Sequence, residues 1–136
     1  MTELFTQEQF NQLLENGNDE NYGKDHHPVI KLFTPDANCT WLLTDLSPED
    51  QDTAFGLCDL GMGFPELGCV SLAEIKELRG KLKLPVERDL GFSAQAPISV
   101  YAEAARSNQQ IVEDEQSLKK ATERLEQYRK SQKCQP

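Results

Sequence analysis

The sequence predicts an α+β fold, in which an antiparallel sheet of four to five strands is covered by two to three helices and followed by a helical tail. Short apolar runs between residues 29 and 70 are separated by turn residues, a pattern typical of antiparallel strands. On both sides of this region, apolar residues recur at helical spacing. With 136 residues, 38% of them hydrophobic, the chain suffices for one core. We expect one domain over residues 1–106 and a charged helical tail over 107–136.

The first element expected is a helix at 6–16. Thr6 and Gln9 have the spacing of a capping box, in which each side chain binds the other residue's backbone amide. An apolar stripe follows at helical spacing, and Gly17 ends it. The polar residues after Gly17 predict a loop that reaches residue 27.

The sheet is expected to be built mainly from four apolar runs. They occupy residues 29–33, 40–46, 53–59 and 66–70. The third run is apolar on both faces, which favours a central position in the sheet. Gly61 and Gly63 separate the last two runs and predict a tight reversal, because glycine tolerates backbone angles that other residues avoid.

Three further elements follow the four strands. Ser71 and Glu74 match the capping-box pattern and predict a helix over 71–79. Residues 84–92 predict a fifth strand, and Pro85 confines it to an edge of the sheet. From Pro97 the pattern is helical over 97–106, and we expect this helix to continue to about residue 130.

The tail predicts a solvent-exposed or docking helix rather than a strong coiled coil. Ile111, Leu118 and Leu125 recur every seven residues, but the position three residues after each of them is Asp114, Ala121 and Tyr128 in turn. Such a seam is poor for a coiled coil. A homodimer through this helix is one alternative that the sequence leaves open.

Composition excludes several classes of protein. No apolar run approaches the roughly 20 residues that span a bilayer, and the N-terminus lacks the pattern of a signal peptide, so we expect a cytoplasmic protein without membrane contact. The four cysteines lack a C-x-x-C pair and are expected to be reduced thiols: Cys39, Cys58, Cys69 and Cys134. No nucleotide-binding or nucleophile-elbow motif is present, and we expect no cofactor and no bound metal.

Charge is distributed unevenly along the chain. The net charge is −9, and no basic residue lies between Lys31 and Lys76. Seven acids in this interval form a candidate partner-binding surface: Asp36, Asp45, Glu49, Asp50, Asp52, Asp59 and Glu66. Such a field repels phosphate backbones and attracts basic protein surfaces. We therefore expect a basic protein partner and no direct binding of nucleic acid.

Two carboxylates carry the alternative of an enzyme. Asp59 and Glu66 flank the glycine turn, and two carboxylates that face each other across a hairpin can bind a divalent cation. A histidine at position 26 or 27 would complete a small metal-dependent hydrolase. The plainer interpretation is that Asp59 caps the turn and Glu66 is solvated. Whether these four side chains converge is not readable from the sequence.

Several segments between His26 and Arg106 resemble a bacterial family of unknown function. The residues that carry the resemblance are Thr40-Trp41-Leu42-Leu43-Thr44, Ala54-Phe55-Gly56-Leu57-Cys58-Asp59-Leu60-Gly61-Met62-Gly63, Pro65-Glu66-Leu67-Gly68, Leu84-Pro85-Val86-Glu87-Arg88-Asp89 and Ser99-Val100-Tyr101-Ala102-Glu103. The likeness covers roughly residues 26–106. Members of this family are similar to small proteins encoded on plasmids and other mobile elements, near antirestriction and DNA-transfer genes.

Together these observations favour a non-enzymatic accessory protein of a bacterial mobile element. It would act by protein contact through its acidic surface, with a DNA-handling enzyme as one candidate partner. One specific form is DNA mimicry, in which spaced carboxylates imitate phosphates and block a restriction enzyme. The metal-dependent hydrolase based on Asp59 and Glu66 is the alternative.

Overall fold

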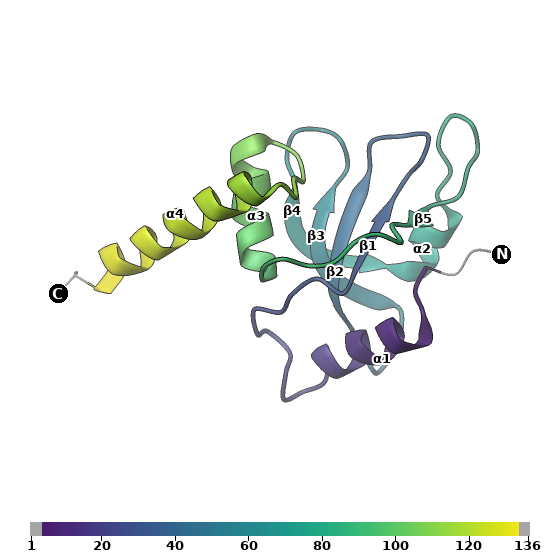
Figure 1. Cartoon of the computed structure of the whole chain (residues 1–136). Helices are drawn as coiled ribbons and strands as arrows, with labels where there is room; N and C mark the ends of the chain where they lie inside the picture. Colours follow the sequence, from purple (N-terminus) through teal and green to yellow (C-terminus); the bar gives the residue numbers. More distant parts are fainter. Residues whose placement is uncertain (1–3, 134–136) are drawn as a thin grey trace.

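A computed structural model describes residues 4–133 and contains one five-stranded antiparallel sheet with four helices over that range (Figure 1). The strand order is β4-β3-β2-β1-β5. In chain order, the elements are α1 (Gln7–Asn16), β1 (Ile30–Phe33), β2 (Thr40–Leu46), β3 (Thr53–Asp59), β4 (Glu66–Ser71), α2 (Leu72–Glu77), β5 (Glu87–Arg88), α3 (Ile98–Asn108) and α4 (Glu115–Lys133). The α+β class predicted from the sequence is confirmed. Cys134 lies outside the described residues.

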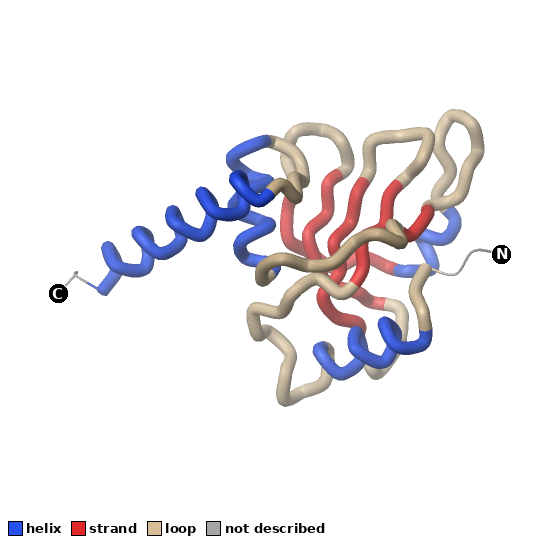
Figure 2. The backbone as a smooth tube through the Cα atoms, in the orientation of Figure 1, coloured by secondary structure: helices blue, strands red, loops and turns tan. Residues whose placement is uncertain are grey.

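Two hydrophobic clusters pack against opposite faces of the sheet. Trp41 and Leu43 of β2 belong to the first cluster, with side chains of α1 and α2. Leu42 lies between them in sequence and belongs to the second cluster, with side chains of α3 and α4. Successive side chains of a strand point to opposite faces, so this alternation divides the core. We call the side of the sheet that carries the first cluster, with α1 and α2, the first face. The side that carries the second cluster, with α3 and α4, is the second face. Figure 2 shows the helices arranged around the strands.

The expected capping box of α1 is present. Thr6 Oγ1 accepts a hydrogen bond from the Gln9 amide at 3.1 Å, and the Gln9 side chain accepts one from the Thr6 amide at 2.8 Å. Gly17 follows the helix, and its amide donates to carbonyls of the last turn. Leu13 is fully buried against the sheet. Both ends of α1 therefore lie where local sequence chemistry places them.

A β-bulge at Thr44 changes which face the end of β2 presents. Leu43 pairs with Gly56, but the next pair joins Asp45 to Phe55, so Thr44 is an extra residue. A bulge of this kind reverses the alternation of side chains beyond it. Leu46 consequently joins Leu43 in the first cluster, and Asp45 is turned to the second face.

The fifth strand is much shorter than expected. Only Glu87 and Arg88 pair with β1, whereas the sequence pattern predicted strand over 84–92. Asp89 ends the strand, because its carboxylate accepts a hydrogen bond from the Gly91 amide at 2.9 Å and pairs with Lys31 at 3.4 Å. The predicted edge position is correct, and the predicted length is wrong.

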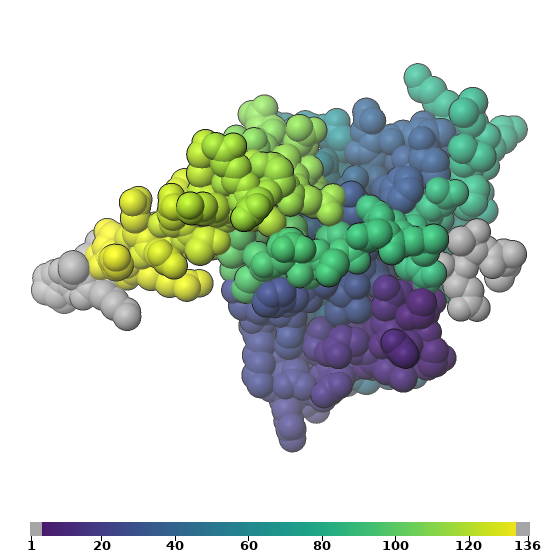
Figure 3. Space-filling view, viewed as in Figure 1, coloured from purple at the N-terminus to yellow at the C-terminus, as the bar shows by residue number. Residues whose placement is uncertain are grey.

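The predicted continuous helix from Pro97 to about residue 130 is also wrong. Helix α3 ends at Asn108 because Gln109 adopts a left-handed conformation with φ 58°. The Asp114 carboxylate then accepts a hydrogen bond from the Ser117 amide at 2.9 Å and begins α4. Leu118 and Ala121 pack on α3, and the remainder of α4 extends away from the sheet (Figure 3). None of the helices described over residues 4–133 is long and apolar enough to cross a membrane.

Candidate functional site

Two of the seven acids of the predicted surface connect loops that are distant in sequence. Asp36 Oδ2 accepts hydrogen bonds from the amides of Leu82 and Leu84, at 2.7 and 3.3 Å. Asp59 accepts one from Gly61 at 2.9 Å and one from Ile111 at 2.9 Å, one on each carboxylate oxygen. Asp59 is 5% exposed, so both bonds are shielded from water. The carboxylates of Asp36 and Asp59 therefore each connect segments that are far apart in the sequence.

Asp50 and Asp52 also bind backbone amides. Asp50 Oδ1 accepts hydrogen bonds from the amides of Asp52 and Thr53. The Thr53 hydroxyl donates to the other oxygen at 2.6 Å, and these bonds lower the pKa of Asp50 to about 2, with Thr53 the largest cause. Asp52 accepts from the Ser71 hydroxyl at 2.7 Å and from the Ala73 amide at 2.8 Å, and so caps α2. Ser71 caps the same helix through the Glu74 amide.

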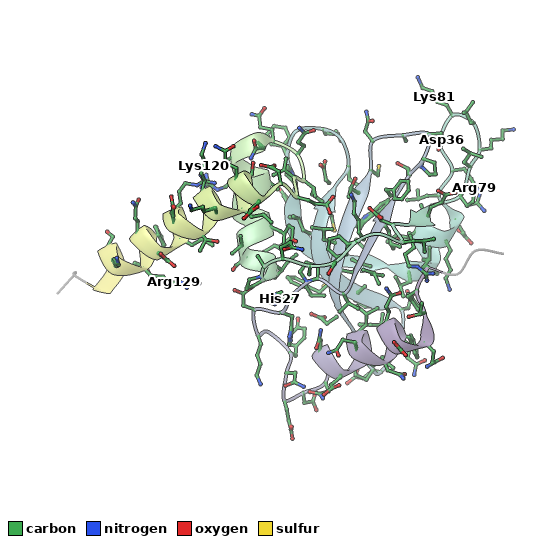
Figure 4. All side chains as sticks on the ribbon, viewed as in Figure 1. His27, Asp36, Arg79, Lys81, Lys120 and Arg129 are labelled. Carbon is green, nitrogen blue, oxygen red and sulfur yellow. The ribbon has the colours of Figure 1, made fainter. Side chains whose placement is uncertain are left out.

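The three remaining acids divide between the interior and the surface. Asp45 is 6% exposed, and its carboxylate accepts a hydrogen bond from the Thr44 hydroxyl at 3.0 Å. Burial raises the pKa of Asp45, against the opposing effects of Thr44 and His26. Glu49 and Glu66 are exposed. The seven acids are therefore spread over loops, core and surface, and in Figure 4 Asp36 lies beside the loop of Arg79 and Lys81.

Asp59 and Glu66 lie on opposite faces of the sheet. Glu66 pairs with Cys58, and paired residues of an antiparallel ladder share a face. Asp59 is the next residue of β3 and therefore points to the other face. The expectation that the two carboxylates face each other across the hairpin is wrong. The capping interpretation of Asp59 holds, since its carboxylate binds the Gly61 amide of the turn.

The two histidines lie in the loop that precedes β1. The His26 ring contacts the Asn21 carbonyl oxygen at 2.8 Å, and the His26 carbonyl accepts a hydrogen bond from the Ile98 amide at 2.8 Å. His27 is exposed. Within residues 4–133, no group of three or more histidine, cysteine or acidic side chains is arranged to hold a metal ion.

The three described cysteines are free thiols, and one of them is poorly suited to nucleophilic chemistry. Burial, followed by the proximity of Cys69, raises the pKa of Cys58 to about 11. Burial also raises the pKa of Cys39. Because the thiolate is the reactive form, a protonated Cys58 at neutral pH is a structural side chain.

A polar cavity of about 680 Å³ opens at the second face, between the β1–β2 turn, the β3–β4 turn and the segment that joins α3 to α4. Lys31 is the basic side chain of its lining, and it forms ion pairs with Asp89 and Glu113. Burial lowers the pKa of Lys31, but the two carboxylates outweigh this effect and the net shift is upward. The Lys31 charge is thus already neutralised inside the protein.

The tip of the β3–β4 hairpin exposes three large apolar side chains within five residues. Leu60, Met62 and Phe64 are 56%, 74% and 78% exposed. The glycines between them have positive φ angles, 78° at Gly61 and 88° at Gly63. A Cβ atom at Gly61 would lie 2.7 Å from that of Asn38, so the base of the tip is closely packed. Sequence reasoning explained the glycines by turn geometry and missed the exposure of these side chains.

These features describe an α+β domain in which four of the seven acids of the predicted surface bind backbone amides of the protein itself. Comparison with protein families identifies the group more closely: residues 4–112 match the family described as "Protein of unknown function (DUF2958)", and the chain belongs to it. The membership predicted over residues 26–106 is confirmed, and the match also includes α1. Helix α4 lies outside the match. The comparisons with curated proteins and with solved structures gave no match.

Asp25 is a structural residue whose role the sequence did not reveal. Its carboxylate accepts hydrogen bonds from the Ser99 amide at 3.0 Å and from the Ser99 hydroxyl at 2.6 Å. It therefore caps α3, whose own preceding residue, Pro97, makes no side-chain cap. The sequence offered one local indication of such a cap: the helix begins after Pro97, whose side chain cannot cap it, so a capping group must come from elsewhere.

Proposed function

We propose that this protein is a binding domain without catalytic chemistry, and that it contacts a basic partner protein through the β3–β4 hairpin. The observation that carries the proposal is the exposed apolar tip formed by Leu60, Met62 and Phe64. Large apolar side chains gathered on a surface are typical of protein contact sites. Because the base of the tip is closely packed, the hairpin loses less conformational entropy when a partner binds, and the cost of binding is lower.

The expected charge of the partner follows from the absence of bases in the segment of the chain that contains the hairpin. No lysine or arginine occurs between Lys31 and Lys76, an interval that contains all of β2, β3 and β4. Glu66 is exposed at the start of β4, directly beside the tip. A basic surface would be attracted to this part of the molecule and an acidic one repelled.

The resemblance to proteins of mobile elements supports a DNA-handling enzyme as the class of partner. The strict form of this idea, DNA mimicry, needs a row of free carboxylates. It has less support, because four of the seven acids bind backbone amides and Asp45 is buried. The contact that we propose is instead an apolar tip with acidic surroundings.

The alternative, a metal-dependent hydrolase using Asp59 and Glu66, has little support. The two carboxylates point to opposite faces, and Asp59 uses both oxygens to bind amides. We expect a scan of divalent cations to leave the thermal unfolding midpoint unchanged. A cation-dependent rise that Asp59→Asn removes would favour the enzyme.

Site-specific photocrosslinking in the native host tests the proposed contact. A photoreactive amino acid would replace Met62 at the tip or, as a control, Tyr128 on α4; these residues are 74% and 64% exposed. We expect a discrete adduct with a basic protein from position 62 and not from position 128. Absence of any adduct specific to position 62 would contradict the proposal. A DNA-processing enzyme in the adduct would support the antirestriction role.

A further inference from the structure

We propose that the outer edge of β4 binds an extended segment of the partner as an additional antiparallel or parallel strand. This inference rests on the proposed function and specifies how the contact is made. Strand β4 is an edge of the sheet, since the order is β4-β3-β2-β1-β5. Its residues Glu66, Leu67 and Cys69 are exposed. An open edge offers a row of backbone donors and acceptors to another chain.

The register of the ladder identifies which amides face outward. The Leu72 amide donates to the Asp52 carbonyl oxygen at 2.9 Å, just beyond the paired residues Thr53 and Ser71. In an antiparallel ladder, hydrogen-bonded pairs alternate with pairs whose N–H and C=O groups point away. Val70 and Gly68 therefore bond to β3.

The same alternation directs the backbone N–H and C=O groups of Leu67 and Cys69 away from β3. Among the described residues, no hydrogen bond joins these groups to another part of the chain. Two residues spaced in this way, i and i+2, provide the donors and acceptors that an added strand uses.

A shallow apolar cavity of about 400 Å³ lies along this edge and fits the side chains of an added strand. It lies between the hairpin and α2, and it is lined in part by Trp41, Leu60, Val70, Ile75 and Leu78. Leu78 is 42% exposed and Leu60 56%, so the walls of the cavity already contact solvent. Alternate side chains of an added strand would point toward this cavity.

The opposite edge of the sheet lacks these properties. Strand β5 is two residues long, and both residues, Glu87 and Arg88, are charged. Short, charged edges are the usual protection against unwanted pairing. Strand β4 has six residues, no lysine and no internal proline. The contrast places the open edge at β4 alone among the described strands.

Charge and geometry define the occupant as a basic, partly apolar segment of another protein. Glu66 begins β4, and Glu74 of α2 lines the cavity beside it. A second copy of this chain fits poorly, because two molecules with a net charge of −9 repel each other. The chain's own basic loop around Lys81 and Lys83 is held by Asp36 through the amides of Leu82 and Leu84, so it cannot supply an added strand.

Selection from a phage-displayed library of random linear 12-residue peptides tests strand addition. We expect peptides with alternating apolar residues and at least one lysine or arginine. Their affinity should fall at least tenfold in Cys69→Pro, which removes the outward amide at a position where an edge strand tolerates proline. The matched control, Cys69→Ala, removes the thiol but keeps the amide, and it should bind like the wild type.

Amide hydrogen exchange supplies a second measurement, which applies even if Cys69→Pro does not fold. In the free wild-type protein, the amides of Leu67 and Cys69 should exchange rapidly, because they have no acceptor among the described residues. The selected peptide should protect both amides. Selection of no peptide, or equal binding to Cys69→Pro and Cys69→Ala without such protection, would overturn strand addition. A dimer that Cys69→Pro dissociates would overturn the assignment of the occupant in favour of a second copy.

The two proposals fail in distinguishable ways. If peptide binding survives Cys69→Pro but is lost in a double Met62→Ser, Phe64→Ser variant, the hairpin contact stands and strand addition does not. If position 62 yields no crosslinked adduct in the host, the hairpin contact fails as the protein's function, whatever the peptides do.

Discussion

At the scale of single residues, Asp59 illustrates how a carboxylate that resembles a catalytic group is occupied by the fold. Its oxygens accept the amides of Gly61 and Ile111, and they join the hairpin to the segment between α3 and α4. A buried carboxylate that accepts two amide bonds satisfies donors that would otherwise be unpaired. Its neighbour across the turn, Glu66, is exposed at the start of β4.

Replacement of Asp59 separates its structural role from a catalytic one. Asp59→Ala leaves the amides of Gly61 and Ile111 without their acceptor, and we expect the free energy of unfolding to fall by about 2 kcal/mol or more. Urea denaturation measures this loss. The control, Glu66→Ala, removes an exposed carboxylate and should change the free energy by no more than about 0.5 kcal/mol. Equal stability of the two variants would refute the capping role.

At the scale of secondary-structure elements, the helices depend on acids from remote loops. Asp25 caps α3 from 74 residues away, and Asp52 caps α2 from 21. Each carboxylate satisfies an amide in the first helical turn, where negative charge also complements the helix dipole. The loops before β1 and β3 are thereby fixed to helices on the two faces of the sheet.

The cap of α3 can be tested with two aspartates of the same loop. Asp25→Ala removes both hydrogen bonds to Ser99 and should lower the free energy of unfolding by about 1 kcal/mol. Asp19 is exposed and makes no side-chain hydrogen bond within the described residues, so Asp19→Ala should have almost no effect. Thermal unfolding of both variants measures the difference. A larger loss in Asp19→Ala would argue against the cap.

Glu103 makes the contact between α3 and α4 dependent on pH. Burial raises the pKa of Glu103, but ion pairs with Arg106 and Arg124 outweigh it and the net shift is downward. A lowered pKa means that the stabilisation is present above the pKa of the unfolded chain. It is lost as the pH falls through the lower pKa of the folded protein.

Glu103→Gln should therefore destabilise the protein at pH 7 by about 0.5 to 1 kcal/mol, a modest amount because the arginines are partly exposed. The difference from the wild type should disappear in strong acid, below the folded pKa. Urea denaturation at several pH values provides the test. A difference that stays constant across this range would show that Glu103 acts through packing instead of charge.

Elements that depend on neighbouring residues could be predicted from the sequence. Features that depend on contacts between distant residues could not. Strand β2 was expected at 40–46 and is found there, because turn residues bound its apolar run. The bulge at Thr44 was missed because β2 is buried on both faces, so polarity does not mark which face each side chain takes. The break after Asn108 was missed because one of its stabilising contacts, from the Ile111 amide to Asp59, joins residues 52 apart.

The candidate site was predictable in charge but not in geometry. Counting residues revealed the interval without bases, yet the hydrogen bonds of Asp36, Asp52 and Asp59 cannot be read from their spacing. Whether a carboxylate meets solvent or a backbone amide depends on loops that the fold brings together. The exposed tip at Met62 was hidden for the same reason, because an apolar residue next to glycine is equally compatible with burial.

At the scale of the whole molecule, the basic residues are unevenly distributed. Helix α4 carries bases, of which Lys120 and Arg129 are labelled in Figure 4, whereas β2, β3 and β4 have none. Apolar side chains are exposed at the hairpin of this base-free region, beside an open strand edge. We propose that the partner binds at this hairpin and edge.

Hydrogen exchange of the purified complex, formed with the partner that crosslinks to position 62, is the decisive test of binding at the hairpin and edge. We predict slower exchange over residues 60–71 in the complex and unchanged exchange over α4. Protection confined to α4, or to the cavity beside Lys31, with residues 60–71 unaffected, would contradict the claim.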